Sequence, residues 1–271
     1  MRDQTLSVLG CGWLGLPLAK RMISLGFTVK GSTTTRDKLP LLQQAGITSY
    51  LLAAGPELGG GDITSFFQSR ILFLNIPFRR HLKNPDDFKN QVEAVIPYIE
   101  NSSIDFVVFA SSTSVYPDSL KDAREDAEFV PDNTRAKTLL NAEELLRDTP
   151  QFDTTIVRFA GLYGGERKIG RVLAGRKGLN GGNCPVNLVH LDDCVEIVAQ
   201  IILKDVRGEI FNACSDGHPF RQEIYTKAAV HNGLEPPQFT DQPRTRQKVV
   251  NNTKLKKRLC YTFRHPDPME F

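Results

Sequence analysis

The stretch that decides the fold is Thr5-Leu-Ser-Val-Leu-Gly10-Cys-Gly12-Trp-Leu-Gly15-Leu-Pro-Leu-Ala-Lys20. A short apolar run typical of a β-strand ends in Gly-x-Gly-x-x-Gly, and an apolar helical pattern follows at once. Gly10 allows a sharp turn off the strand, Gly12 lets a pyrophosphate approach the backbone, and Gly15 lets the helix pack closely on the strand. The first N–H groups of the helix, with their partial positive charge, then face the phosphates. The motif predicts a dinucleotide-binding turn; the alternative is an ordinary glycine-rich β–α turn.

The composition indicates an ordinary globular protein. The chain has 271 residues, of which 40% are hydrophobic and 24% charged, and its formal net charge is +3. This length suits one large domain or a nucleotide-binding domain with a smaller appendage, and the charge is too small to indicate nucleic acid or a membrane surface as partner. Apolar runs such as residues 71–78 are far shorter than a membrane span, and no leader pattern precedes the first strand. We therefore expect a cytoplasmic protein.

Cysteines and histidines are dispersed. None of the five cysteines forms a Cys-x-x-Cys pair, and none of the five histidines shows His-x-x-x-His spacing. Reduced thiols and no metal site are predicted. The basic residues 254–258 read as the exposed face of a short helix capped by Asn252 or Thr253, since a nucleic-acid site needs more charge and aromatic partners.

The end of the second predicted strand, residues 27–31, bears on the choice of cofactor. An acidic residue at this point accepts hydrogen bonds from the adenosine ribose and selects NAD, whereas hydroxyls with a nearby arginine accommodate the 2′-phosphate of NADP. No acid stands here, and the available donors are Ser32, Thr33, Thr34 and Arg36. NADP is predicted, with NAD as the alternative. These residues can also serve only as turn and cap residues of the next helix.

Further strand and helix patterns alternate along the chain. They predict an α/β fold with a parallel, doubly wound sheet and right-handed crossovers. The predicted strands are residues 48–53, 70–77 and 105–110, and the predicted helices are residues 38–45, a short one after the glycine-rich loop 55–61, and 86–100. The end of the strand at 70–77 makes Asn75, Ile76 and Pro77 candidate cofactor contacts.

Three later segments complete a family pattern: Ser111-Ser-Thr-Ser-Val-Tyr116, Val157-Arg-Phe-Ala-Gly-Leu-Tyr163-Gly164 and Val186-Asn-Leu-Val-His-Leu-Asp192-Asp193. Together with the glycine loop, they make the chain resemble an atypical branch of the extended short-chain dehydrogenase/reductases, also called the NAD-dependent epimerase/dehydratase family. The resemblance implies a Rossmann fold with a small C-terminal substrate lobe. It divides the chain into residues 1–164, to which 187–214 return, and a lobe at 165–271. Many relatives dimerise through helices equivalent to 86–100 and 139–147, so a homodimer is possible.

The family's chemistry uses a serine that binds the substrate oxygen and a Tyr-x-x-x-Lys pair that moves the proton. Ser112 matches the serine, but residues 125–146 contain no tyrosine. Matching the flanking sequence without a gap puts Arg135 and Leu139 at the tyrosine and lysine positions; the other register puts Asn133 and Lys137 there. We prefer the first. An arginine cannot give up its proton, so Arg135 can polarise a carbonyl or hold an anion but cannot act as the acid.

Two other tyrosines, Tyr116 and Tyr163, remain as proton donors if they reach the substrate; packing is the alternative for both. The resemblance implies further cofactor-side residues, which are Trp13, Leu14, Ser111, Phe159 and Ala160. The residues implied at the substrate are Ser112, Thr113, Tyr163, Arg171 and Asn187. Ser112 can also be a simple cap of the next turn, and Arg171 belongs to a basic loop, 166–182, that can equally be solvated. Asp192 and Asp193 are expected to cap the helix at 193–203.

Three functional hypotheses follow. The first is an NADP-using oxidoreductase or epimerase-like enzyme that acts on a small anionic or sugar-nucleotide substrate. The second is a non-catalytic dinucleotide sensor or partner protein, which the missing Tyr-x-x-x-Lys favours. The third, a reductase of the 6-phosphogluconate or ketopantoate type, requires an all-helical C-terminal half, and the predicted strands at 154–159 and 208–212 argue against it.

Overall fold

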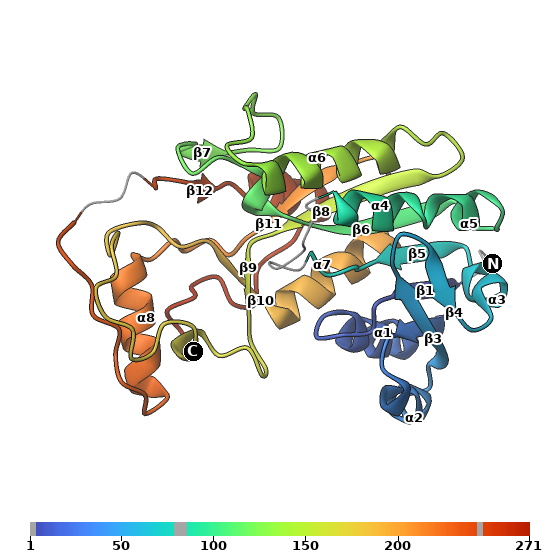
Figure 1. The fold of residues 1–271 in the computed structure, drawn as a ribbon, viewed down its shortest axis with the longest axis horizontal. Coiled ribbons are helices and arrows are strands. Elements are labelled where there is room, and N and C mark those ends of the chain that lie inside the picture. Colours follow the sequence, from blue (N-terminus) through green and yellow to red (C-terminus); the bar gives the residue numbers. More distant parts are fainter. Residues whose placement is uncertain (1–3, 79–85, 243–245) are drawn as a thin grey trace. The chain divides into compact units, whose positions relative to one another are not determined.

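The computed structural model describes residues 4–78, 86–242 and 246–271, and its main feature is an eight-stranded, mostly parallel β-sheet (Figure 1). The strands are β1 (Thr5–Leu9), β2 (Thr28–Thr33), β3 (Thr48–Ala54), β4 (Leu58–Gly60), β5 (Ile71–Leu74), β6 (Phe106–Ser112), β8 (Asp153–Phe159) and β11 (Ile210–Ala213). Their order is β11-β8-β6-β5-β1-β2-β3-β4. The chain thus builds outward from β1 in one direction and from β5 in the other, which confirms the predicted doubly wound sheet.

Helices connect the parallel strands. They are α1 (Gly15–Ser24), α2 (Leu39–Gln44), α3 (Ile63–Phe67), α4 (Asp87–Glu93), α5 (Ile96–Glu100), α6 (Thr134–Arg147) and α7 (Leu191–Leu203). Because the sheet is wound in opposite directions from β1 and β5, right-handed crossovers put α1 on one face and α4 and α6 on the other (Figure 1).

Two predictions in this region were wrong. The single helix expected at 86–100 is broken into α4 and α5, because Pro97 lacks an N–H group and its ring excludes a continuous helix. Pro97 instead takes the second position of α5, where a helix tolerates proline. The glycine-rich loop after β3 also contains a strand, β4, that pairs antiparallel with β3. Dimerisation through α4, α5 and α6 stays a prediction.

The chain divides into two compact units. Unit 1 consists of residues 1–111, 133–157 and 198–210. Unit 2 consists of residues 112–132, 158–197 and 211–271. The division into a nucleotide-binding domain at 1–164 and a lobe at 165–271 stays a prediction.

The core of unit 1 lies around its central strands. All four residues of β5 are buried, as expected for a parallel strand covered on both faces. Fully buried side chains on β1 and β6 include Leu6, Val8, Phe106 and Phe109. Burying a side chain of this size contributes about 1.5–3 kcal/mol, so these strands hold the carboxyl end of the sheet in place.

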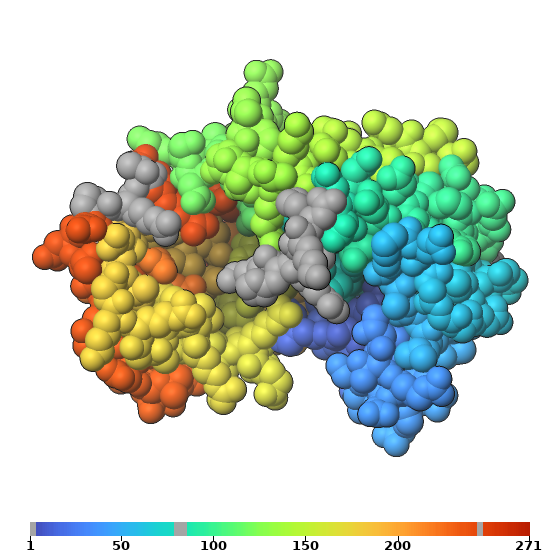
Figure 2. Space-filling model, in the orientation of Figure 1, coloured from blue at the N-terminus to red at the C-terminus, as the bar shows by residue number. Residues whose placement is uncertain are grey.

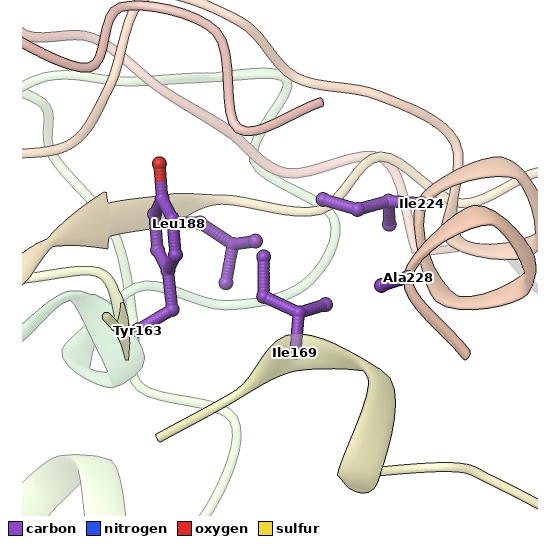
Figure 3. Close-up of a cluster of buried hydrophobic side chains, with 5 residues drawn as sticks. All are labelled: Tyr163, Ile169, Leu188, Ile224 and Ala228. Atoms are coloured by element: carbon purple, nitrogen blue, oxygen red, sulfur yellow. The ribbon is translucent and has the colours of Figure 1, made fainter. Parts of the chain in front are cut away.

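Unit 2 contains smaller elements. They are β7 (Asp122–Ala123), β9 (Gly161–Tyr163), β10 (Leu188–His190), β12 (Val249–Val250), α8 (Arg221–His231), α9 (Thr253–Leu259) and the 3-10 turns η2 (Thr113–Val115) and η3 (Ile169–Arg171). β9 pairs with β10, and β7 pairs with β12, both in parallel. A hydrophobic cluster joins β9, β10, η3 and α8, as Figure 3 shows for Tyr163, Ile169, Leu188, Ile224 and Ala228.

Among the residues that the structure describes, no helix is long and apolar enough to cross a membrane. The five cysteines all lie in the described ranges and none forms a disulfide. Of the basic residues in α9, Lys256 is paired with Asp216 at 2.9 Å. Asn252 is the N-cap of α9, but its side chain makes no capping hydrogen bond and donates instead to the Cys214 carbonyl oxygen at 2.8 Å.

Candidate functional site

The glycine loop between β1 and α1 has two glycines that are required by packing and one that is not. Gly10 has a φ of +107°, and a Cβ there would lie 2.5 Å from the Asn75 carbonyl oxygen. A Cβ on Gly15 would overlap the Gly10 carbonyl oxygen. A Cβ on Gly12, by contrast, would meet no atom within 4 Å. The loop therefore leaves open space above the Gly12 backbone, which is the space that a pyrophosphate needs, and the residues present fit a dinucleotide.

The end of β2 supports this loop from one side. The Gly10 N–H donates to Ser32 Oγ at 2.9 Å, and the Cys11 N–H donates to the Ser32 carbonyl oxygen at 2.8 Å. Ser32 is buried, so its side chain positions the loop. Thr33 is also buried and accepts a hydrogen bond from the Thr35 N–H at 3.2 Å.

The other two residues predicted at the ribose are exposed. Thr34 follows β2, and Arg36 begins the 3-10 turn η1 (Arg36–Lys38). Their side chains are accessible to a ligand at the end of β2. The side chain of Ser32 is hydrogen-bonded to the glycine loop, and that of Thr33 to the backbone of Thr35. Recognition of a 2′-phosphate by Arg36 stays a prediction.

The end of β5 supports the loop from the other side. The Asn75 N–H donates to the Leu9 carbonyl oxygen at 3.0 Å, and Asn75 Nδ2 donates to the Gly10 carbonyl oxygen at 2.9 Å. Ile76 is buried and Pro77 is exposed. Asn75 thus acts on the conformation of the glycine loop, a role that its position after an apolar strand does not reveal.

Arg135 lies in the first turn of α6 and contacts the segment after β5. Its Nη2 donates to the Phe78 carbonyl oxygen at 2.9 Å, and its guanidinium lies 3.9 Å from the centre of the Phe78 ring. A planar cation on an aromatic ring adds about 0.5–2 kcal/mol. Arg135 therefore holds the backbone after β5 in addition to any contact with a ligand.

The other residues of the two registers for the missing pair lie in α6 or at its N-cap, and the choice between the registers stays a prediction. Asn133 is the N-cap, and its Oδ1 accepts a hydrogen bond from the Ala136 N–H at 2.9 Å. Lys137 is exposed, and Leu139 is buried in the core of unit 1.

A nearby buried pair was not predicted: Ser111 Oγ donates to Glu143 Oε1 at 2.5 Å. This bond directs the Ser111 hydroxyl toward α6.

Unit 2 begins at Ser112, the predicted substrate-binding serine. Ser112 is the N-cap of η2, and its Oγ accepts a hydrogen bond from the Ser114 N–H at 3.2 Å. A hydroxyl that accepts one bond keeps its own proton to donate, so capping and substrate binding are compatible. The neighbouring Thr113 is buried, and its carbonyl oxygen accepts a hydrogen bond from Lys248 Nζ at 3.4 Å.

Tyr116 is enclosed within unit 2 and is only 1% exposed. Its hydroxyl donates to Asn212 Oδ1 at 2.9 Å and accepts from Arg158 Nη1 at 2.7 Å. Burial raises the pKa of Tyr116 in spite of the Arg158 charge. A hydroxyl with both roles filled and a raised pKa is a poor proton donor to a substrate, so this environment favours the packing role.

The remaining predicted residues of unit 2 are mostly engaged. Tyr163 is 5% exposed, and burial raises its pKa. The Asn187 side chain joins two segments, because its Nδ2 donates to the Lys248 carbonyl oxygen at 2.8 Å and its Oδ1 accepts from the Val250 N–H at 2.9 Å. Phe159 and Ala160 are buried at the end of β8.

Arg171 is the exception and is exposed. It belongs to the segment at about residues 165–180, which Figure 2 shows in yellow at the surface. An open groove of about 550 Å³ runs along α8, lined among others by Phe220 and Lys227, and none of the predicted substrate residues lines it. The exposure of Arg171 fits the alternative that the basic loop at 166–182 is solvated, and its contact with a substrate stays a prediction.

Comparison with known proteins settles the family. The chain is 32% identical over 267 residues to "Protein YeeZ" of Escherichia coli (strain K12), covering 97% of each chain. The chain belongs to the YeeZ family. No protein-family model matches it.

Solved structures of the same fold add to the picture of this YeeZ-family chain. A short-chain dehydrogenase/reductase superfamily protein from Agrobacterium tumefaciens with bound NAD has a TM-score of 0.77 at 17% identity, covering 96% of this chain and 92% of that one. A UDP-glucuronic acid 4-epimerase from Bacillus cereus in complex with NAD also has a TM-score of 0.77 at 17% identity, covering 98% and 96%. At these identities the likeness is one of fold, and it confirms the predicted Rossmann-type architecture.

Sequence reasoning missed the buried polar network of this YeeZ-family chain. Arg158 is 4% exposed, and Asn212, which is fully buried, donates its backbone N–H to Glu125 Oε1 at 2.7 Å. A charged residue inside the apolar strand Ile156-Val-Arg-Phe159 was the available signal. Lys248, whose Nζ donates to the Tyr116 carbonyl oxygen at 2.8 Å, carried no such signal.

The expected capping role of Asp192 and Asp193 was also wrong. Both lie inside the first turn of α7, which begins two residues earlier than predicted. Asp193 is fully buried, and its carboxylate accepts hydrogen bonds from the C-terminal segment. It therefore joins that segment to α7 and does not cap the helix.

Glu125 gives this network a pH dependence. Burial raises the pKa of its carboxyl, so the ionised form is disfavoured in the folded state. Its contribution to stability is then full below the ordinary glutamate range and is lost as the pH rises through the folded-state pKa. The Glu125→Gln variant keeps an acceptor oxygen and does not titrate. Its free energy of unfolding should therefore gain on that of the wild type between about pH 4 and pH 7.

Urea denaturation at several pH values between these limits measures the difference. Glu128→Gln, in an exposed position three residues away, is the control for loss of a negative charge. A difference between Glu125→Gln and wild type that stays constant or shrinks with rising pH would contradict the assignment.

Proposed function

We propose that the chain binds NADP at the glycine loop of unit 1 and is an oxidoreductase or epimerase-like enzyme that acts on a small anionic or sugar-nucleotide substrate. The observation that carries the proposal is the open space above Gly12, between two glycines that packing requires. The first turn of α1, with its partial positive charge, follows directly. The bound NAD in structures of the same fold supports the same class of ligand.

The preference for NADP rests on the end of β2. No carboxylate stands there to accept hydrogen bonds from the ribose hydroxyls, and the exposed Arg36 offers a fixed positive charge. An arginine fork matches a phosphate with two parallel hydrogen bonds, which a lysine does not.

For the reaction, a bound nicotinamide dinucleotide would supply or accept a hydride. Ser112 can donate a hydrogen bond to a substrate oxygen, since its capping bond uses only a lone pair. Arg135 would fix an anionic or carbonyl group of the substrate. Neither residue can transfer a proton at neutral pH, so in this proposal water is the acid.

The second candidate is a non-catalytic dinucleotide sensor or partner protein. One observation favours it: the hydroxyl of Tyr116, a candidate to replace the missing tyrosine, is held between Arg158 and Asn212. A protein of this kind keeps the cofactor loop and turns over no substrate.

Calorimetric titration with NADP and then NAD tests the cofactor. Gly12→Ala fills the open space with a methyl group and is expected to weaken binding of both at least ~10-fold. Arg36→Ala is expected to weaken NADP alone, by about 10-fold, as for the loss of one charged hydrogen-bonding partner. Lys38→Ala, exposed in the same turn, is the matched control. Failure of the wild type to bind either cofactor overturns the proposal, and a preference for NAD overturns the role of Arg36.

Turnover separates the two candidates. NADPH oxidation and sugar epimerisation are measured with phosphorylated sugars and nucleotide sugars, in the wild type and in Ser112→Ala. Activity that falls in Ser112→Ala while NADP affinity stays unchanged supports the enzyme. Tight cofactor binding with no turnover of any of these substrates supports the sensor.

A further inference from the structure

Three side chains that are far apart in the sequence of unit 2 converge at one point. His190 ends β10, Asp192 lies in the first turn of α7, and His265 belongs to the C-terminal segment. His190 Nδ1 lies 3.5 Å from Asp192 Oδ2, and His265 Nε2 lies 3.2 Å from the same oxygen. One ligand atom from each of the three side chains lies within 4.8 Å of the other two.

We propose that His190, Asp192 and His265 bind a divalent transition-metal ion, with Zn²⁺ as the ion that fits best. Two imidazole nitrogens and one carboxylate oxygen are a ligand set that Zn²⁺ accepts and that Mg²⁺ and Ca²⁺, which prefer oxygen alone, do not. Metal–ligand bonds of 2.0–2.1 Å in a tetrahedron put neighbouring ligand atoms about 3.3 Å apart. Both distances to Asp192 Oδ2 are within a few tenths of an ångström of that value.

The orientation of His190 is set by its surroundings. The edge of its ring meets Tyr163 at 5.0 Å between centroids, and its face lies against the His265 ring at 3.7 Å. A Cβ on Gly164 would overlap His190 Nε2, so this nitrogen packs on a bare backbone. The other nitrogen, Nδ1, therefore faces Asp192. Nδ1 is unprotonated, because it accepts a long hydrogen bond, 3.2 Å, from the Asp192 N–H, and a metal ion at this nitrogen would take the place of that bond.

The position of His265 is set by the neighbouring acid, Asp193. The buried Asp193 carboxylate accepts hydrogen bonds from the Tyr261 hydroxyl at 2.7 Å, the Arg264 N–H at 2.7 Å and the His265 N–H at 3.1 Å. Asp193 is a positioning residue in this arrangement: it fixes the backbone that carries His265 opposite His190. Groups that hold a ligand in place without binding the metal themselves commonly orient metal ligands.

Exposure indicates how such an ion would be held. The side chains of His190, Asp192 and His265 are 17%, 53% and 32% exposed, so the ion would have three protein ligands and a position open to water. Since the ligands come from β10, α7 and the C-terminal segment, bound metal would connect these three segments and raise the stability of the folded chain.

The test uses the full chain, freed of metal with a chelator and dialysed. Titration with Co²⁺, which absorbs visible light when bound in tetrahedral geometry, and with Zn²⁺ by calorimetry is expected to saturate at one ion per chain. Asp192→Asn keeps the size of a half-exposed side chain and removes the charge, and His190→Gln removes a nitrogen ligand. Each is expected to lower the affinity at least ~10-fold. His231→Gln, which replaces a histidine of α8 outside the cluster, is the matched control.

Thermal unfolding gives a second readout. Zn²⁺ is expected to raise the midpoint of the wild type and of His231→Gln, and at the same concentration to raise that of Asp192→Asn less. Asp192→Asn also guards against misfolding, since its metal-free midpoint should equal that of the wild type. No saturable binding by the wild type, or an affinity that is the same in Asp192→Asn, overturns the proposal and leaves the three side chains as a polar cluster without metal.

Discussion

Gly15→Ala is expected to lower the free energy of unfolding by about 2–3 kcal/mol, as overpacking of a closely packed position does. A Cβ at this position would overlap the Gly10 carbonyl oxygen and would lie 3.1 Å from Val8 Cγ1. The obstacle is backbone of the loop and a fully buried side chain of β1, neither of which can move without disturbing the sheet. Alanine improves helix propensity by up to about 1 kcal/mol, so the steric term is the larger.

Urea denaturation at neutral pH measures this loss, and the matched control is Gly12→Ala in the same loop. The Gly12 variant should unfold within about 0.5 kcal/mol of the wild type, because its methyl group enters open space. The pair separates two reasons for a glycine: Gly15 is required by the fold, and in the proposed function Gly12 is required by the dinucleotide. Equal destabilisation in the two variants would contradict the difference between a crowded Gly15 and an open Gly12.

Asn212→Ala is expected to cost about 3 kcal/mol or more, because it leaves several buried groups without partners. Asn212 is fully buried, and its Oδ1 accepts from the Tyr116 hydroxyl. Its Nδ2 donates to the carbonyl oxygens of Ala123 at 2.9 Å and Asn251 at 3.1 Å. Truncation removes all three bonds and opens a cavity at a fully buried position.

The control for this variant is Asn101→Ala, which removes one exposed hydrogen bond, from Asn101 Nδ2 to the Pro97 carbonyl oxygen. That change is expected to cost about 0.5 kcal/mol or less. Chemical denaturation compares the two, and near-ultraviolet circular dichroism reports whether the Tyr116 environment changes in Asn212→Ala. If Asn212→Ala lowers the free energy of unfolding no more than Asn101→Ala does, the buried polar network does not stabilise the fold.

The sequence predicted the sheet because local pattern and topology agree there. The apolar runs of β1, β5 and β6 are typical of parallel strands buried on both faces, and their alternation with helices predicts a doubly wound sheet. The break at Pro97 was not predicted, although a proline inside a helical pattern signals it. β4 gave no such signal, since three residues rich in glycine do not form a strand pattern.

The candidate site was predictable only where backbone shape decides it. The roles of Gly10 and Gly15 follow from the motif. Ser32, Asn75 and Asn187 were expected to contact ligands; their side chains bind backbone groups, which was not predicted, and their contacts with a ligand stay a prediction. Residue type identifies a side chain that can form hydrogen bonds. Only the tertiary structure shows whether that side chain is already bonded to a backbone carbonyl or N–H group. The convergence of His190 and His265 is of the same kind, because 75 residues separate them.

The five junctions between the units, at 111/112, 132/133, 157/158, 197/198 and 210/211, bear on how the protein is made. On the ribosome, unit 1 lacks its last segment until residue 210 has been synthesised. A nascent chain therefore exposes apolar strands for most of its synthesis and cannot fold one unit at a time. For the same reason no single cut yields either unit intact, and a premature stop before residue 210 would leave unit 1 incomplete and exposed to the cell's proteases.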